Sequence, residues 1–333
     1  MMTKTTNRVR GIAGAWRNFW FEPQSMMTLG LLRIVFGVVV FGWGLSLGPD
    51  LFDLFGRDGV MPEPISSPYL WGLLHVFPSD TAVVILWGLL LVAAAALTVG
   101  WHSRLAALVV LLIVLSFERR NMFVFNSGDV LLRIEALFLV LSPCGSALSL
   151  DRKRTAGSFW SAQMRAPWTL RLFQLQLSLV YLVSVQGKLA GGTWIDGTAV
   201  SYALRVSDLT TFSLPSWVIN SPLFINFASW STLVLEVALA ILVWNKAARP
   251  KVLVLGVIMH VTILMSLAVA FFSFAIFVLY LSFLSPETAE RWARKLFGWK
   301  IAERPIEVVD AKSGKRAKRS SEPVEELVGA ASS

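Results

Sequence analysis

Long apolar runs are the feature of this sequence that most constrains its fold. Segments of about 20 mostly hydrophobic residues recur along the chain, and a helix of that length crosses a hydrocarbon core of roughly 30 Å. Of the 333 residues, 55% are hydrophobic and only 15% are charged, which is too apolar for a soluble domain of this size. The sequence therefore predicts an all-α polytopic membrane protein with its transmembrane helices in one bundle.

About eight apolar segments are expected to be transmembrane helices. They cover residues 28–48, 81–100, 104–118, 129–148, 168–189, 223–245, 251–270 and 272–285. The third and the last are short, and residues 252–285 could instead form one long helix or a hairpin that turns at Phe271–Ser273. Seven and nine spans are therefore the alternatives to eight.

Charges in the loops predict the orientation, because lysine and arginine collect in short cytoplasmic loops. With the N-terminus inside, the inward loops contain Arg104 and Arg152–Arg154, whereas the outer loops at 50–80 and 190–222 are more acidic. Only Arg119–Arg120 disagree with this assignment. An even number of spans then places both termini in the cytoplasm.

Two flanking segments differ from the transmembrane region of residues 28–285. Residues 1–27 combine basic residues with tryptophan and phenylalanine, which is typical of a helix lying at the membrane interface. Residues 286–333 form a basic cytoplasmic tail that is polar beyond about Ala302. This tail is expected to be largely disordered.

The composition also argues against several classes of function. Cys144 is the single cysteine, and the three histidines form no ligand pattern, so neither a disulfide nor a metal site is expected. There is no P-loop for an ATP-driven pump. The net charge of +9 suits anionic membrane lipid better than nucleic acid, for which no recognition motif is present.

Ionisable residues within the spans are the main candidates for function, because each is costly in hydrocarbon unless it is paired or faces a cavity. Glu236 interrupts the sixth span and His260 the seventh, and neither has a charged neighbour in its own helix turn. Each needs a partner from another helix or has to be uncharged. For His260, a structural hydrogen bond and a role in a site are equally compatible with the sequence. Asp129 and Arg133 are four residues apart and could neutralise each other on one helix face.

Lys188 closes the fifth span at its outer end, next to Gly187. A lysine at such an edge usually extends its amine to the polar interface. Alternatively, an apolar pocket could hold the amine uncharged, because burial disfavours the ammonium ion. A neutral amine is a general base, and it could then take a proton from a phenol or quinol lying in the membrane.

Several short motifs occur in an order that resembles a known family. They are Tyr181…Gly187-Lys188-Leu189…Trp194…Asp196-Gly197, Leu31–Arg33, Phe55–Gly59, Arg120–Asn121, Asn126–Asp129, Ser149–Asp151, Leu235–Glu236, His260 and Phe271–Ser273. Together they extend over roughly residues 25–290. They resemble the HTTM (horizontally transferred transmembrane) family, the bacterial relatives of the vitamin K-dependent gamma-carboxylase.

The resemblance implies a membrane enzyme in which a lysine deprotonates reduced vitamin K, which reacts with oxygen and becomes the epoxide. Lys188 falls on that lysine, and the residues expected to bind and orient the quinol are Asn126, Ser127, Glu236 and His260. Reduced vitamin K or menaquinone would be the co-substrate, and no metal is implied. The bacterial plasma membrane is the expected location.

The sequence departs from the carboxylase in three places. Asn126–Ser127 matches an asparagine–histidine pair with serine in place of histidine, Lys188 stands alone where the carboxylase has two lysines, and no large substrate-binding domain follows the helices. Glutamate carboxylation is therefore not expected. Two other functions stay open: a membrane component that matures or exports a secreted peptide with a small protein partner, and a non-catalytic protein that binds quinone or lipid.

Overall fold

The computed structural model describes residues 2–63, 65, 71–206, 210–212 and 214–297, and most of them are α-helical. The main helices are α1 (Met2–Phe21), α2 (Met27–Leu47), α5 (Asp80–Val99), α6 (Ser103–Arg120), α7 (Ser127–Leu141), α9 (Trp168–Leu189), α13 (Pro222–Ile241), α14 (Arg249–Ser266), α15 (Ala270–Leu281) and α16 (Pro286–Phe297). Short helices in the connections are α3 (Leu51–Phe55), α4 (Leu73–Val76), α8 (Leu150–Ala156), α10 (Gly192–Ile195), α11 (Ala199–Ala203) and α12 (Ser216–Ile219), and the 3₁₀ turn η1 (Leu242–Trp244) extends α13. Strands β1 (Gln24–Ser25) and β2 (Met164–Arg165) pair antiparallel.

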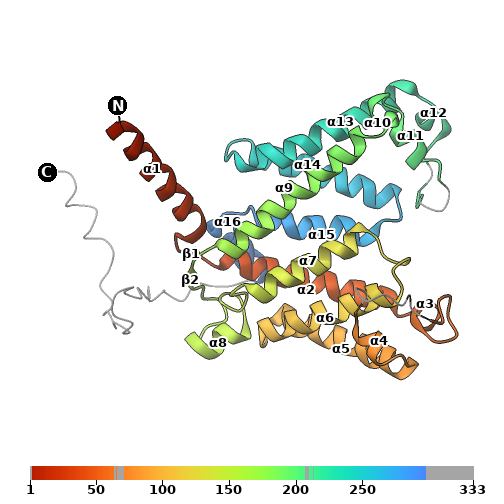
Figure 1. Ribbon diagram of the computed structural model, residues 1–333, viewed down its shortest axis with the longest axis horizontal. Helices are drawn as coiled ribbons and strands as arrows, with labels where there is room; N and C mark the ends of the chain where they lie inside the picture. The colour runs from red at the N-terminus through yellow and green to blue at the C-terminus, as the bar shows by residue number, and fades with distance from the viewer. Residues whose placement is uncertain (1, 64, 66–70, 207–209, 213, 298–333) are drawn as a thin grey trace. The chain divides into compact units, whose positions relative to one another are not determined.

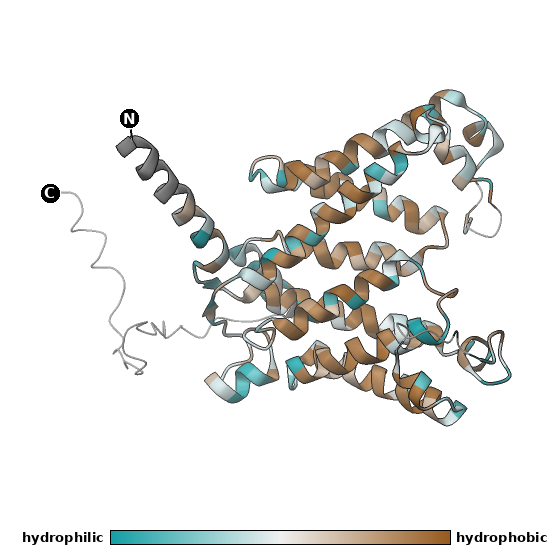
Figure 2. Ribbon diagram, viewed as in Figure 1, coloured by the Kyte–Doolittle hydropathy of each residue, from teal (hydrophilic) through white to brown (hydrophobic). Residues whose placement is uncertain are grey.

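Residues 1–290 form one compact unit, in which the long helices lie side by side (Figure 1). Helix α2 packs against α5 and α15, α7 against α6 and α15, and α9 against α13. The core of the unit includes Leu32, Phe36, Val40 and Trp43, which recur every three or four residues along one face of α2. This period is that of an α-helix. Figure 2 shows that apolar residues dominate the long helices and that hydrophilic residues gather toward the ends of the bundle.

The fold confirms the prediction of an all-α membrane protein. Each of the eight expected segments is mainly helical. Within the described residues, five helices are long and apolar enough to cross a bilayer: α2, α5, α9, α13 with η1, and α14. Of the other three, α6 carries Glu118, Arg119 and Arg120 in its last turn, and α7 and α15 have only 15 and 12 residues.

The segment 252–285 forms a helical hairpin, so the alternative of one long helix was wrong. Helix α14 ends at Ser266, and α15 begins at Ala270 and packs against it. The chain turns because Leu267 has an extended backbone and makes a β-bridge to Thr210. The turn therefore lies a few residues before the expected position at Phe271–Ser273.

The two flanking segments contain helices. Helix α1 covers most of the N-terminal segment 1–27 as one continuous helix. At the other end, residues 286–297, which precede the part expected to be disordered, form α16. The basic run of the tail belongs to residues 298–333, which lie outside the described residues.

Gly37 permits the close approach of α2 to α5. A Cβ atom at this position would lie 2.3 Å from Thr98 Oγ1 and 2.8 Å from its backbone nitrogen. We expect Gly37→Val to lower the free energy of unfolding by about 2–3 kcal/mol, because backbone atoms of α5 cannot move aside easily. Unfolding of the purified protein in mixed micelles measures this loss. The matched control is Gly88→Ala, since a Cβ at Gly88 meets nothing within 4 Å; equal stability of the two variants would contradict the prediction.

Candidate functional site

Lys188 and Glu236 form an ion pair between two neighbouring helices. Lys188 lies in the last turn of α9, Glu236 lies in α13, and the lysine Nζ donates to Glu236 Oε1. Their side chains are 19% and 7% exposed. Lys188 Nζ also donates to Ser184 Oγ at 2.9 Å, because residues four apart share a helix face. The amine that was expected either at the polar interface or uncharged in an apolar pocket is thus largely buried and paired.

Only one oxygen of the Glu236 carboxylate has a partner within the described residues. Oε1 accepts from Lys188 and lies 3.4 Å from Ser184 Oγ. Oε2 is buried, and no hydrogen-bond donor in the described part of the chain reaches it. Since buried polar atoms are nearly always hydrogen-bonded, Oε2 is the position where a hydroxyl or amide of a ligand could donate.

An aromatic side chain covers the amine of Lys188. The Trp194 ring, on α10, has its centroid 4.9 Å from Lys188 Nζ. This geometry is that of a cation–π contact, and the ring covers one side of the amine. The pair therefore has polar groups on one side and an aromatic ring on another.

A second polar cluster joins α9, α14 and α15. Tyr181 Oη lies 2.9 Å from His260 Nε2 and 2.5 Å from Tyr280 Oη, and His260 Nδ1 lies 3.1 Å from Ser273 Oγ. His260 is only 1% exposed, and both of its ring nitrogens have partners. This answers the question left open by the sequence about a partner for His260.

The two clusters are connected through α9. Tyr181 precedes Lys188 by seven residues, which places both side chains on a similar face about 10 Å apart along the helix axis. Gly256 makes room for this arrangement, because a Cβ there would lie 2.3 Å from Tyr280 Oη.

Asn126 and Ser127 belong to the start of α7 and take part in neither hydrogen-bonded cluster. Asn126 caps α7: its Oδ1 accepts from Gly128 N at 2.7 Å, and its own N–H donates to Asp129 Oδ2 at 2.7 Å. Within the described residues, neither Asn126 nor Ser127 hydrogen-bonds to Lys188, Glu236 or His260. The connection from α6 to α7 does lie at the same end of the bundle as the C-terminal end of α9 (Figure 1).

Asp129 and Arg133, which could have neutralised each other on one helix face, do not form an ion pair. Arg133 forms its ion pair with Glu118 of α6. Asp129 instead accepts from Trp43 Nε1 at 2.7 Å and from the backbone N–H of the α7 cap. The reason is that partners on other elements compete with the neighbour four residues away, and Glu118, only 6% exposed, needs a counter-charge.

Sequence reasoning did not identify Ser184, Tyr181, Trp194 and Tyr280 as members of the site. The spacing Tyr181, Ser184, Lys188 on one helix face was an available signal. No local pattern indicated Tyr280, which contacts Tyr181 from a distant part of the chain. No group of three or more His, Cys, Asp or Glu side chains that could hold a metal occurs within the described residues.

The helical bundle and its buried amine–carboxylate pair define a polytopic membrane protein with an ionisable site between helices. The family model described as HTTM domain matches residues 21–288. This match covers most of the chain, so the protein belongs to the HTTM domain family, as its sequence motifs predicted. No curated protein and no solved structure gives a significant match.

Proposed function

We propose that this membrane protein removes a proton from the hydroxyl group of a quinol, which oxygen then converts to the epoxide. The observation that carries the proposal is the Lys188–Glu236 pair, in which Glu236 Oε2 is buried without a partner in the described part of the chain. A quinol hydroxyl supplies the donor that this oxygen lacks. Membership of the HTTM domain family supports a quinol as the phenolic ligand.

In this proposal, Lys188 acts as a base after it has passed a proton to Glu236. The amine and Glu236 Oε1 are in direct hydrogen-bond contact, so a proton can pass between them without an intermediary. Transfer of that proton produces a neutral amine and a neutral carboxylic acid, and exclusion of water by a bound ligand favours this uncharged form. The amine then accepts the quinol proton. One O₂ oxidises the quinol to the epoxide, and the second oxygen atom leaves as water with both quinol hydrogens.

The surrounding residues have supporting roles in the proposal. Trp194 shields the amine from water on one side, which adds to the desolvation that favours the uncharged pair. His260 has both nitrogens engaged, so we assign it to orienting Tyr181. Asn126 and Ser127 are exposed at the same end of the bundle and are proposed to contact the polar part of the quinol.

We further propose that the protein lies in the bacterial plasma membrane with both termini in the cytoplasm. Supporting this, α8 and β2, which contain Arg152–Arg154 and Arg165, lie at the end of the bundle opposite to α10 (Figure 1). Lysine and arginine accumulate on the cytoplasmic side of membrane proteins. Lys188, next to α10, would then face the outer leaflet.

The direct test uses the purified protein in lipid nanodiscs with reduced menaquinone or reduced vitamin K and oxygen. We expect quinone epoxide to accumulate with time and to be detected by mass spectrometry. Heat-inactivated protein and empty nanodiscs are the controls for spontaneous oxidation. Absence of epoxide from folded protein contradicts the enzymatic proposal, and saturable quinone binding without epoxide would instead indicate a non-catalytic quinone-binding protein.

A further inference from the structure

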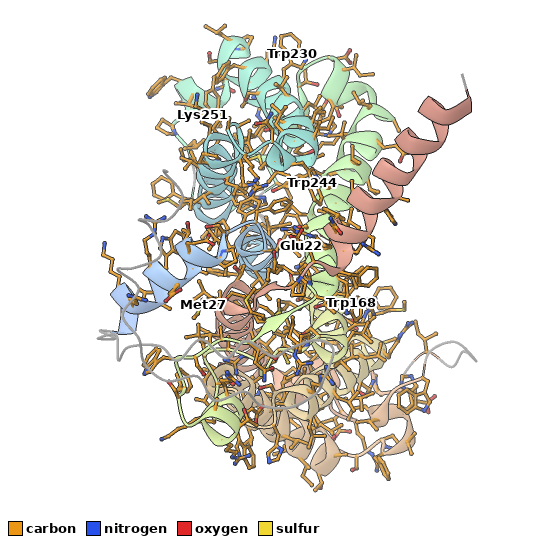
Figure 3. All side chains as sticks on the ribbon, turned by 90° about the vertical axis from the view of Figure 1, so that its left-hand side faces the viewer. Glu22, Met27, Trp168, Trp230, Trp244 and Lys251 are labelled. Atoms are coloured by element: carbon orange, nitrogen blue, oxygen red, sulfur yellow. The ribbon has the colours of Figure 1, made fainter. Side chains whose placement is uncertain are left out.

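A basic pocket lies at the end of the bundle opposite to Lys188. It has a volume of about 600 Å³ and is lined by the start of α6, the segment after α7, α8 and β2. Figure 3 looks onto this end of the molecule, where Lys251 is labelled well away from α8. The pocket is thus distinct from the Lys188–Glu236 site.

Three arginines from different elements line the pocket: Arg104, Arg152 and Arg165. Each is oriented by a hydrogen bond from its Nε. Arg104 donates to the Ser142 carbonyl at 2.9 Å, Arg152 to Ser161 Oγ at 2.9 Å, and Arg165 to the side-chain oxygen of a neighbouring glutamine at 3.2 Å. Arg152 is only 7% exposed, so its guanidinium group is held at the pocket surface and does not extend into solvent.

Asp151 is the acidic residue in the lining, and its oxygens are occupied. Oδ1 accepts from the His102 N–H at 2.9 Å, and Oδ2 accepts from the Ser103 N–H and hydroxyl at 2.8 and 2.7 Å. Burial tends to raise the pKa of the Asp151 carboxyl, but these hydrogen bonds outweigh it and the pKa is below its usual value. Asp151 therefore serves to hold the start of α6, and the exposed side chains of Arg104 and Arg165 give the lining its positive charge.

Apolar side chains lie beside the pocket. Leu105, in its lining, is 60% exposed, and the neighbouring Trp101 is 45% exposed. Exposed tryptophan is enriched where a membrane protein crosses from hydrocarbon to the headgroup region. The combination of arginines with an adjacent apolar surface matches a phospholipid, whose phosphate is followed by acyl chains.

We propose that this pocket binds a phosphate group, supplied by the headgroup of an anionic phospholipid or by free phosphate. Guanidinium groups pair with phosphate oxygens through two parallel hydrogen bonds. Basic pockets between transmembrane helices on the cytoplasmic side suit such headgroups. The proposal concerns a binding site and is independent of the quinol chemistry.

The test measures ligand affinity of the delipidated protein in detergent. In the first arm, the protein is titrated with phosphatidylglycerol and, separately, with phosphatidylcholine. In the second arm, it is titrated with inorganic phosphate, and chloride at equal ionic strength is the control. Binding is measured by native mass spectrometry and by intrinsic tryptophan fluorescence. The variant Arg104→Gln/Arg165→Gln should bind phosphatidylglycerol or phosphate at least about tenfold more weakly. Lys251→Gln, which removes a charge at the same end outside the pocket, should change the affinity less than about twofold.

Each outcome has a definite meaning. A preference for phosphatidylglycerol that the double variant loses identifies the lipid as the source, and phosphate binding without that preference identifies the free anion. Equal affinities of the wild type and the double variant, or equal binding of phosphatidylcholine and phosphatidylglycerol without phosphate binding, would overturn the proposal. If the double variant does not fold, the single variant Arg165→Gln decides the question. Arg165 is exposed, so its replacement should leave the fold intact and still weaken ligand binding severalfold.

Discussion

Replacing Lys188 with methionine is expected to lower the rate of quinol epoxide formation by at least about 100-fold. Methionine fills a similar volume but cannot accept a proton, so the variant tests the amine rather than the packing at the end of α9. The measurement is the initial rate of epoxide formation in nanodiscs, together with quinone affinity measured separately. A large loss of rate with little change in affinity is the expected combination, because the amine acts mainly on the transferred proton.

The matched control is Lys251→Met. Lys251 lies in the first turn of α14, is exposed, and lies at the opposite end of the bundle. Its replacement should leave the epoxide rate within about twofold of wild type. If Lys188→Met retains the full rate, the proton acceptor is another group and the proposed mechanism fails, even if epoxide is formed.

Removal of one member of the buried pair should destabilise the protein more than removal of both. We expect Glu236→Leu to lower the free energy of unfolding by about 2–3 kcal/mol. This loss is small for the removal of one partner from a buried ion pair, because the Lys188 side chain is still 19% exposed to solvent. The lysine amine would then keep Ser184 and the Trp194 ring as neighbours but lose its counter-charge. The double variant Lys188→Met/Glu236→Leu should recover most of this loss.

A double-mutant cycle of unfolding in mixed micelles measures the coupling. The four proteins are the wild type, the two single variants and the double variant. Losses that simply add would show that the two side chains do not interact in the folded protein. The cycle needs no substrate, so it tests the observed pair separately from the proposed chemistry.

The sequence predicted the positions of the helices well because each is encoded in a continuous apolar segment. It also identified Lys188, Glu236 and His260 as residues that need an explanation, since ionisable groups are rare within spans. Their partners could not be predicted. Lys188 and Glu236 are 48 residues apart, and Tyr181 and His260 are 79 apart, so their contacts depend on how α9, α13 and α14 pack.

Local signals also had more than one meaning. Asn126 was assigned to the site from the family resemblance, yet its position before Asp129 is also typical of a helix cap, and the structure has that cap. Similarly, the spacing of Asp129 and Arg133 is compatible with an ion pair, but α6 offered Arg133 a different acidic partner. For Asn126 the structure confirms the local capping pattern, whereas for Arg133 a neighbouring helix determines the partner.

The shallow packing of α14 has a consequence for the site. Its buried residues are Val252, Gly256 and His260, a single stripe with a spacing of four, so most of its circumference is left to lipid. With 18 residues the helix is about 27 Å long, slightly shorter than an average hydrocarbon core of about 30 Å. A span that is shorter than the core is accommodated by local thinning of the bilayer or by snorkelling of its flanking residues, so a thick bilayer is unfavourable around the helix that holds His260 against Tyr181. We therefore expect lipids with long acyl chains to weaken the contact between His260 and Tyr181 more than lipids that match the length of α14.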